Sequence, residues 1–301
     1  MFPGIPHSRA TRAVEGALAR SNFNSCSTSG NSGFILTRYF GRCIPAVRPG
    51  RGDVERREGN FAAAFFDLDR TLVPGASMFW LVRAMVDEGF VPIAKALQLA
   101  VGHVRYRATK KERLATITNA RNSSLRAIRG KDVAELSKIA ERVAMSELAP
   151  RVYPRMAGLI DAHKQAGHLT YLVTASTQEL ARPLAGALGF HAALATHAEV
   201  IDGVYTGRLN GVLNHGMAKA ERVSKLARAL HIDLSRSTAY SDSISDLPLL
   251  ELVSTPVAVH PDKALRSIAR SRGWLVIDPR GDDPISAHEI TSTRHLTSSS
   301  L

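Results

Sequence analysis

The sequence predicts a protein of the α/β class, in which helices cover both faces of a parallel sheet and a separate helical domain is inserted into it. Three observations predict this fold. Residues 61–66 form a short, wholly apolar segment, which is typical of a strand buried inside a parallel sheet. From residue 168 onward, strand-like and helix-like segments alternate. Between these two parts, apolar residues recur every three or four positions, which indicates helices.

The helical block is expected over about residues 78–167, with breaks at Gly89, Gly130 and Pro150. Its clearest periodic run consists of Val133, Leu136, Ile139, Ala140 and Val143. Because the block is far longer than an ordinary connection between elements, we expect an inserted domain rather than a loop.

The segment from residue 168 to residue 278 predicts alternating strands and helices. Strands are expected from short apolar and β-branched runs at 168–174, 192–196, 237–241, 256–260 and 274–278. Helices are expected at 178–188, 217–230, 246–253 and 261–270. A β-hairpin is expected over 200–209, because Asp202-Gly203 suits a tight hairpin turn. Strand–helix–strand repetition of this kind builds a Rossmann-like parallel sheet.

These elements divide the chain into parts. Residues 61–73 and 166–278 are expected to form the catalytic core, and residues 74–165 the inserted helical domain. Residues 1–60 have no sustained period and many Gly, Ser, Pro and Arg, so we expect a basic, disordered extension. Residues 279–301 are expected to be a disordered tail.

Composition sets broad limits on function. The chain is 45% hydrophobic and 22% charged, which is ordinary for a globular protein. Its net charge of +12 suits an anionic substrate or a nucleic acid, although an arginine-rich, solvated surface is the simpler interpretation. Both cysteines, Cys26 and Cys43, precede the core, so neither a disulfide framework nor cysteine chemistry is expected there.

The location of the protein is predicted from what the sequence lacks. No apolar run reaches the roughly 18 residues needed to span a bilayer. The sequence therefore predicts a cytoplasmic protein with no stable nucleic-acid or membrane partner, and it gives no indication of oligomeric state. Residues 1–60 remain open to three interpretations: a targeting segment, a disordered extension, or a start codon assigned too far upstream.

Acidic and hydroxyl residues follow three of the predicted strands, at the carboxyl ends where open α/β sheets build their sites. They are Asp67, Asp69 and Thr71, then Thr174, and finally Asp242 and Asp246. Converging carboxylates would repel one another unless a cation lay among them, and an all-oxygen ligand set indicates Mg²⁺. Lys219, near the start of the helix expected at 217–230, could neutralise a bound phosphate, and Thr174 could donate to one of its oxygens.

The same residues suit phosphoryl transfer, which requires an in-line nucleophile and stabilisation of charge. Asp67 directly follows a buried strand and is the candidate nucleophile, which would form an aspartyl-phosphate. Asp69, two residues later, is the candidate acid and base: it would protonate the leaving oxygen and then deprotonate the attacking water.

Four motifs along the chain resemble those of the haloacid dehalogenase superfamily, and most closely those of subfamily IB, the group around phosphoserine phosphatase. In chain order they are FFDLDRTL, LVTAS, Lys219 and YSDSISDLPLL. The resemblance covers roughly residues 61–278. It implies the roles already given to Asp67 and Asp69, with Thr174 and Lys219 as phosphate-binding residues. It also implies a Mg²⁺ site that comprises Asp67, the backbone carbonyl of Asp69, Asp242 and Asp246, the last of which supports either the ion or Lys219. The inserted helices correspond to the cap domain of this family.

The sequence departs from the phosphoserine phosphatase pattern in the cap. That pattern places a glutamate about nine residues after the nucleophile, but residues 73–80 contain no acid. The arginine expected to bind the substrate carboxylate has no clear counterpart; the candidates are Arg105, Arg107, Arg113 and Arg121. Met78, Phe79 and Trp80 would give the pocket an apolar wall or, the interpretation we favour, belong to the core of the cap.

The sequence therefore predicts a Mg²⁺-dependent phosphatase that acts on a small phosphorylated metabolite. The family favours a phosphoserine-like substrate, whereas the cap residues weigh against phosphoserine itself. Two alternatives remain: a phosphatase for lipid phosphates of the lysophosphatidate type, and a non-catalytic phosphate-binding module on the same scaffold.

Overall fold

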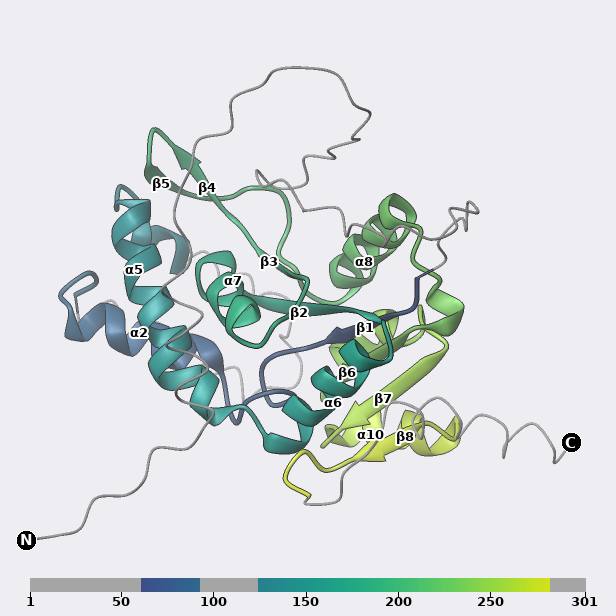
Figure 1. Cartoon of the computed structure of the whole chain (residues 1–301). Coiled ribbons are helices and arrows are strands. Elements are labelled where there is room, and N and C mark those ends of the chain that lie inside the picture. Colours follow the sequence, from purple (N-terminus) through teal and green to yellow (C-terminus); the bar gives the residue numbers. More distant parts are fainter. Residues whose placement is uncertain (1–60, 93–123, 282–301) are drawn as a thin grey trace, which may run out of the picture. The chain divides into compact units, whose positions relative to one another are not determined.

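The computed structural model describes residues 61–92 and 124–281, all of which lie in one unit of the chain, residues 58–301. These residues contain a six-stranded parallel sheet with the order β3-β2-β1-β6-β7-β8 (Figure 1). Its strands are β1 (Ala63–Phe66), β2 (Leu169–Thr177), β3 (Ala192–Thr196), β6 (Thr238–Ser241), β7 (Thr255–Val259) and β8 (Leu275–Ile277). The predicted α/β fold with a parallel sheet is confirmed.

The first strand of the sequence lies in the middle of the sheet. In β1, Phe65 is paired with Tyr171 of β2 on one side and with Ala239 of β6 on the other. From β1 the chain builds the sheet outward to β3, then returns and continues through β6 to the opposite edge. The direction of building reverses between β1 and β6, and open α/β sheets bind ligands beyond the strand ends at such a reversal.

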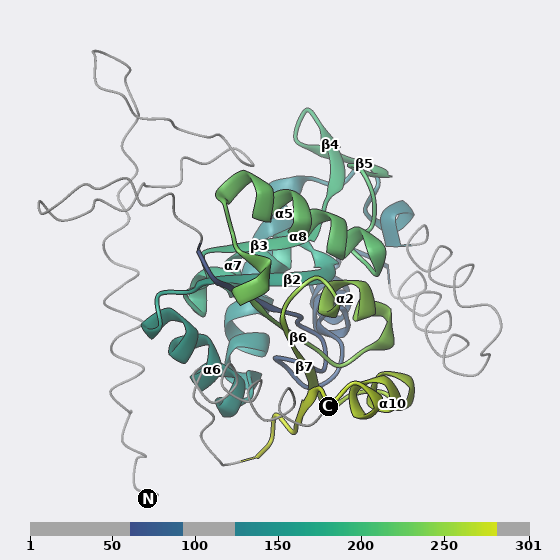
Figure 2. The ribbon, with the colours of Figure 1, turned by 90° about the vertical axis from the view of Figure 1, so that its right-hand side faces the viewer.

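Helices cover both faces of this sheet, as expected. The described helices, including α2 and α5 of the insertion, are α2 (Ser77–Asp87), α5 (Val133–Val143), α6 (Pro154–Gln165), α7 (Gln178–Ala187), α8 (Met217–Leu230), α9 (Leu247–Leu250) and α10 (Lys263–Ser271). Phe66 belongs to the apolar cluster that includes α5, α6 and α7, whereas its neighbour Phe65 belongs to the cluster of α8, α9 and α10. This alternation follows from the period of two in a strand. Figure 2 shows α6 and α8 with the strands between them.

Short helical turns complete the described elements. A π-helical turn (Ala144–Leu148) and a 3₁₀ turn (Ala149–Arg151) join α5 to α6, and two further 3₁₀ turns span Leu234–Arg236 and Ile244–Asp246. The chain is therefore helical almost without interruption from the start of α5 to the end of α6.

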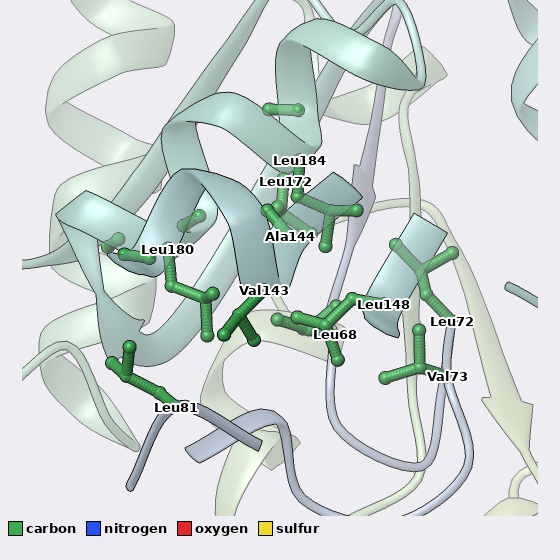
Figure 3. Close-up of a cluster of buried hydrophobic side chains, with 14 of the residues drawn as sticks. Leu68, Leu72, Val73, Leu81, Val143, Ala144, Leu148, Leu172, Leu180 and Leu184 are labelled. Atoms are coloured by element: carbon green, nitrogen blue, oxygen red, sulfur yellow. The ribbon is translucent and has the colours of Figure 1, made fainter. Parts of the chain in front are cut away.

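The inserted helices α2 and α5 pack against each other, at the left of Figure 1. An apolar cluster joins them to the rest of the fold (Figure 3). In this cluster, Leu68 and Leu72 from the segment after β1 lie near Val143 and Leu148, and Leu180 of α7 belongs to the same cluster. Each of these five side chains is at least 98% buried, so the insertion shares an apolar core with the sheet.

One helix of the predicted insertion packs against the sheet. Met156, Leu159 and Ile160 of α6 are fully buried, and the helix contacts β1 and β2. The division into a cap at 74–165 and a core at 61–73 and 166–278 remains a prediction. The contacts of α6 favour a second boundary near residue 153.

A two-stranded hairpin, β4 (Ala198–Ile201) and β5 (Val204–Leu209), turns at Asp202-Gly203 as expected. Both turn residues have positive φ, 50° and 79°, which is the conformation of a type I′ turn. The hairpin is bonded to the start of α5, because Gly203 O accepts from Val133 N at 2.9 Å and Tyr205 N donates to Lys131 O at 3.0 Å. Figure 1 shows the hairpin beside this N-terminal end of α5.

Two predicted elements have the wrong length. The strand expected to end at Thr174 continues to Thr177, with an irregular register against β3 after Val173. The helix expected at 246–253 is a 3₁₀ turn followed by the single turn of α9, because the chain after Leu250 is closed by turn bonds such as Leu252 N to Leu249 O.

Several predictions concern residues outside the described ranges. They are the extension at 1–60, the four cap arginines Arg105, Arg107, Arg113 and Arg121, and all but the first three residues of the tail at 279–301. Among residues 61–92 and 124–281, no helix combines the length and the apolar character needed to cross a bilayer.

Candidate active site

The predicted site residues gather at the reversal point of the sheet. Asp67 directly follows β1, and Asp242 directly follows β6. Asp67 N donates to Tyr240 O at 3.0 Å, which continues the pairing of the two strands and fixes the backbone at the start of the site. Both carboxyl groups are buried, with the residues 6% and 3% exposed.

Lys219 lies between two of the carboxylates. Its Nζ donates to Asp67 Oδ1 at 2.5 Å and to Asp246 Oδ2 at 2.7 Å, and the residue is 2% exposed. Burial lowers the pKa of Lys219, but the charges of Asp246 and Asp67 outweigh it, so the net pKa is raised and the ammonium group stays charged. Burial also raises the pKa of Asp67 to about 7, although Lys219 opposes this.

A glycine delivers Lys219 to this position. Gly216 precedes α8 with φ 58° and ψ −127°, a conformation that is open to glycine and strained for other residues. Lys219 N donates to Gly216 O at 3.1 Å in the first turn of the helix. The sharp change of direction at Gly216 lets the third residue of α8 point into the sheet.

A tight turn follows Asp67. Arg70 has φ 65°, and its N–H donates to Val73 O at 2.9 Å, while Thr71 N donates to Leu68 O at 3.3 Å. Thr71 Oγ1 also donates to Asp67 Oδ2 at 3.4 Å. The N–H groups of Arg70 and Thr71 are therefore already bonded within the turn.

Asp69 is held by the first residue of α2. Its Oδ1 accepts from Ser77 N at 2.7 Å, and the Ser77 hydroxyl donates to Ser176 Oγ at 3.2 Å. Burial raises the pKa of Asp69, and the bond from Ser77 lowers it by a smaller amount. A raised pKa favours the protonated form of the carboxyl group, which a general acid requires.

Thr174 lies where β2 loses its regular register. Its Oγ1 accepts from Ser176 N at 3.0 Å, which leaves the hydroxyl proton for another acceptor. Its carbonyl accepts from Asn214 Nδ2 at 2.9 Å, and the same amide group donates to Leu194 O at 2.8 Å. Asn214 therefore links β2 to β3 at the position of Thr174.

Asp242 forms an ion pair with Arg70, whose terminal nitrogen is 2.9 Å from Asp242 Oδ2. Burial raises the pKa of Asp242 to about 6, although Arg70 opposes this. The segment after Asp242 is anchored by Asp262, whose N–H donates to Asp242 O at 2.8 Å and whose Oδ2 accepts from Ile244 N at 2.9 Å. Asp262 also accepts from two N–H groups at the start of α10 and so links that helix to the site.

The charges and oxygens of the site fit a divalent cation. Two cationic groups stand against four carboxylates, which leaves two negative charges when all are ionised; the groups are Lys219, Arg70, Asp67, Asp69, Asp242 and Asp246. Asp246 Oδ1 is buried and has no hydrogen-bond partner. In the described part of the chain, no three Asp, Glu, His or Cys side chains already surround one point. The ligand set remains a prediction, favoured by the charge balance and by this unpartnered oxygen.

The structure thus brings five of the six predicted residues into two connected groups, while Asp242 is paired with Arg70. Asp67, Lys219 and Asp246 are bonded directly, and Asp69 is linked to Thr174 through two serines. Their roles in the reaction stay predictions. The sequence did not indicate Arg70, Ser77 or Ser176. Arg70 could have been noticed within the first motif, but the two serines meet only through the fold.

The three residues discussed as an apolar wall separate in the structure. Met78 and Trp80 are partly buried against the apolar cluster, in agreement with the core interpretation. Trp80 also lies under the guanidinium group of Arg151, 4.2 Å from its ring centre. Phe79 is 61% exposed, so the core interpretation is wrong for this residue.

Comparisons with known proteins agree with the motifs. A family model described as haloacid dehalogenase-like hydrolase matches residues 64–251, a span that includes every predicted site residue. A phosphoserine phosphatase of Mycobacterium tuberculosis, SerB1, is 39% identical over 219 residues, which cover 73% of this chain and 71% of that protein.

Two further proteins are similar to this chain. A probable phosphatase of Mycobacterium tuberculosis is 34% identical over 215 residues, which cover 71% of this chain and 74% of that protein. A crystal structure of a protein of unknown function from Bordetella pertussis is 30% identical, with a TM-score of 0.64; the match covers 73% of this chain and all of the other.

Proposed function

The chain belongs to the haloacid dehalogenase-like hydrolases and is a phosphatase similar to phosphoserine phosphatases. From this premise we propose that it uses Mg²⁺ to hydrolyse small alkyl phosphomonoesters and that Asp67 carries the phosphoryl group between the two steps. One observation carries the proposal: a buried carboxylate, bonded to a buried lysine, lies at the reversal point of the sheet beside further carboxylates. Such a site suits an anionic substrate together with a divalent cation.

In the first step, a carboxylate oxygen of Asp67 attacks the phosphorus atom, and the bond from phosphorus to the alcohol oxygen breaks. Burial has removed most water from this carboxylate, and the contact with Lys219 Nζ at 2.5 Å favours its ionised form. The product of this step is a phosphoryl group on Asp67 and the free alcohol.

Asp69 supplies the proton that the alcohol oxygen needs to leave. In the second step, water attacks the phosphorus atom, Asp69 takes the proton from that water, and the bond to Asp67 breaks to release inorganic phosphate. Burial raises the pKa of Asp69 and so favours the protonated form that starts the cycle. The residue then returns to this form with each turnover.

Two residues are proposed to hold the phosphoryl oxygens. Lys219 keeps its charge because two carboxylates raise its pKa, and Thr174 has a hydroxyl proton to donate. A bound Mg²⁺ would be held by Asp67, the carbonyl of Asp69, Asp242 and Asp246. It would supply positive charge to the phosphoryl oxygens.

The substrate is proposed to be a small phosphorylated metabolite. The similarity to a phosphoserine phosphatase favours a phosphoserine-like compound. However, Ala76 stands nine residues after Asp67, and residues 73–80 offer no carboxylate to bind an amine. The exposed Phe79, two residues after the Ser77 that contacts Asp69, favours the alternative of a substrate with an apolar part, such as lysophosphatidate.

The test is Mg²⁺-dependent release of phosphate from a panel of alkyl phosphomonoesters that includes phosphoserine, glycerol 3-phosphate and lysophosphatidate. We expect turnover by the wild type and a loss on the order of 10⁴-fold or more in Asp67→Asn. Asp161→Asn is the matched control, since Asp161 is an exposed carboxylate of α6 and should leave the rate unchanged. Failure of the folded wild type to hydrolyse any alkyl ester would favour a non-catalytic phosphate-binding module.

A further inference from the structure

The first residue of α2 contacts both the candidate acid and the end of β2. We propose that Ser77 is a positioning residue for Asp69: its N–H fixes the carboxyl group, and its hydroxyl, held by Ser176, fixes the N–H. Ser77 is fully buried and Ser176 is 3% exposed, so both contacts are shielded from water. This inference rests on the proposed function, because it assigns a purpose to the placement of Asp69.

The bond from Ser77 N has a structural cause. The first N–H groups of a helix have no acceptor within the helix, and a side chain at the position before the helix usually accepts one of them. That position is Ala76, which cannot accept, and the first turn of α2 contains no acid. Asp69 Oδ1 accepts instead at 2.7 Å, so its carboxyl group lies at the positive end of the helix.

The hydroxyl side of Ser77 extends the contact into the sheet. Ser77 Oγ donates to Ser176 Oγ at 3.2 Å, and Ser176 N donates to Thr174 Oγ1 at 3.0 Å. A continuous chain of hydrogen bonds therefore runs from Asp69 to Thr174, the residue proposed to hold the phosphoryl group. Ser176 can take part because β2 continues three residues beyond Thr174.

This chain of bonds sets the position of the acid relative to the bound phosphate. Asp69 must reach the alcohol oxygen in the first step and the water in the second, and a misplacement of about 1 Å can cost on the order of a hundredfold in rate. Because Ser77 belongs to an inserted helix and Ser176 to the sheet, the acid is held correctly only when α2 is seated against β2.

Two variants of Ser77 separate the amide from the hydroxyl. Ser77→Ala keeps the N–H and removes the hydroxyl. Ser77→Pro removes both, and the proline ring would occupy the place of the N–H and push the Asp69 carboxylate away. The helix itself should accept proline, which is favoured at a first helical position. Ala76 has φ −108° and ψ 122°, which suits a residue before proline.

The readout is kcat/KM for two kinds of ester. The alkyl ester is glycerol 3-phosphate or another alkyl ester that the wild type hydrolyses, and the aryl ester is p-nitrophenyl phosphate. An alkyl alcohol needs a proton to leave, whereas nitrophenolate leaves without one. We expect Ser77→Pro to lower kcat/KM for the alkyl ester by about ten- to a hundredfold and for the aryl ester by much less. Ser77→Ala should lower kcat/KM only a few-fold, again more for the alkyl ester than for the aryl ester.

Four other outcomes are possible. An equal loss for both esters would reduce Ser77 to a structural role and overturn the inference, as would wild-type kinetics in a folded Ser77→Pro. If Ser77→Pro does not fold, Ser77→Ala and Ser176→Ala must show the alkyl-selective loss, or the inference fails. A folded wild type that hydrolyses no alkyl ester would instead overturn the proposed function.

Discussion

Burial changes what single side chains of this protein can do. Lys219 is the third residue of α8 and, as an isolated residue in the sequence, would be taken for a solvated lysine. In the fold it is 2% exposed and bonded to two buried carboxylates. Its position depends on the glycine three residues earlier and on a strand more than 150 residues away, as the 152-residue separation from Asp67 shows. Neither dependence is visible locally.

A buried histidine makes stability depend on pH. His163 of α6 is fully buried; its ring nitrogens lie 2.8 Å from His168 Nδ1 and 2.7 Å from Tyr240 Oη. Burial, with the nearby His168, lowers the pKa of His163 from 6.5 to about 3. The unfolded chain therefore binds the proton more tightly than the folded one, so stability is complete above about pH 6.5 and falls as pH decreases towards 3.

We expect the free energy of unfolding to decrease by about 2 kcal/mol between pH 7 and pH 5 through this residue. The measurement is urea unfolding of the wild type and of His163→Gln, which has no proton to gain in this range. The variant should be less stable at pH 7 but should lose less between the two pH values. Parallel decreases in the two proteins would contradict the assignment.

At the scale of elements, the sequence patterns identified the strands and helices discussed here but not every residue at which they end. The apolar run of β1 and the Asp202-Gly203 turn were predicted correctly, because burial on both faces and positive φ leave a local signal. The extension of β2 to Thr177 was missed, since it depends on partners in β3 and on Thr196 Oγ1, which donates to Ala175 O at 2.8 Å. That extension carries Ser176, so the missed strand end concealed a contact of the site.

Helix α10 steadies the side of the site that contains Asp242, where we propose that Mg²⁺ binds. Asp262 accepts from Ala264 N and Leu265 N at its start and from Ile244 N in the segment after Asp242. We expect Asp262→Ala to lower the free energy of unfolding by about 1–2 kcal/mol and to weaken Mg²⁺ binding several-fold. Urea unfolding and titration with Mg²⁺ measure the two effects.

A matched control exists in α5. Asp132 caps that helix by accepting from Glu135 N at 2.9 Å, and it is not bonded to the segment after β6. Asp132→Ala should lose about 1 kcal/mol of stability and leave Mg²⁺ affinity unchanged. Equal affinities in the two variants would show that Asp262 is only a helix cap.

At the scale of the whole molecule, the fold collects more negative charge at one point than it neutralises. With all four carboxylates ionised, two negative charges stay unbalanced, and burial raises the pKa of Asp67 and of Asp242; both features favour the binding of a cation. A ligand that binds only the folded state stabilises it, by about 2.7 kcal/mol at a hundred times its Kd.

Mg²⁺ at that concentration should therefore raise Tm by about 5–10 °C. Differential scanning fluorimetry with MgCl₂, and with KCl at the same ionic strength, measures this effect separately from that of salt. Asp242→Asn should abolish most of the shift. A rise in Tm of the same size in this variant would place the ion elsewhere.

The sequence predicted the fold class and the succession of strands and helices along the chain. It also allowed all six candidate site residues to be named, because most of them directly follow buried strands that can be recognised locally. It did not allow the pairs to be named. Three contacts of the site join residues that are far apart in the sequence and that the folded sheet brings together. They are Asp67 with Lys219, Arg70 with Asp242, and Ser77 with Ser176. Contacts of this kind require the three-dimensional arrangement.

The central position of β1 has a consequence for the protein while it is being made. Asp67 is translated before Lys219, Asp242, Asp246 and the anchoring Asp262. Until then the strand that precedes Asp67 lacks its neighbour on one side, β6, and the aspartate is an ordinary carboxylate. A nascent chain that stops before β6 would therefore contain the proposed nucleophile without its partners, and the candidate site would assemble only after Asp262 has been made.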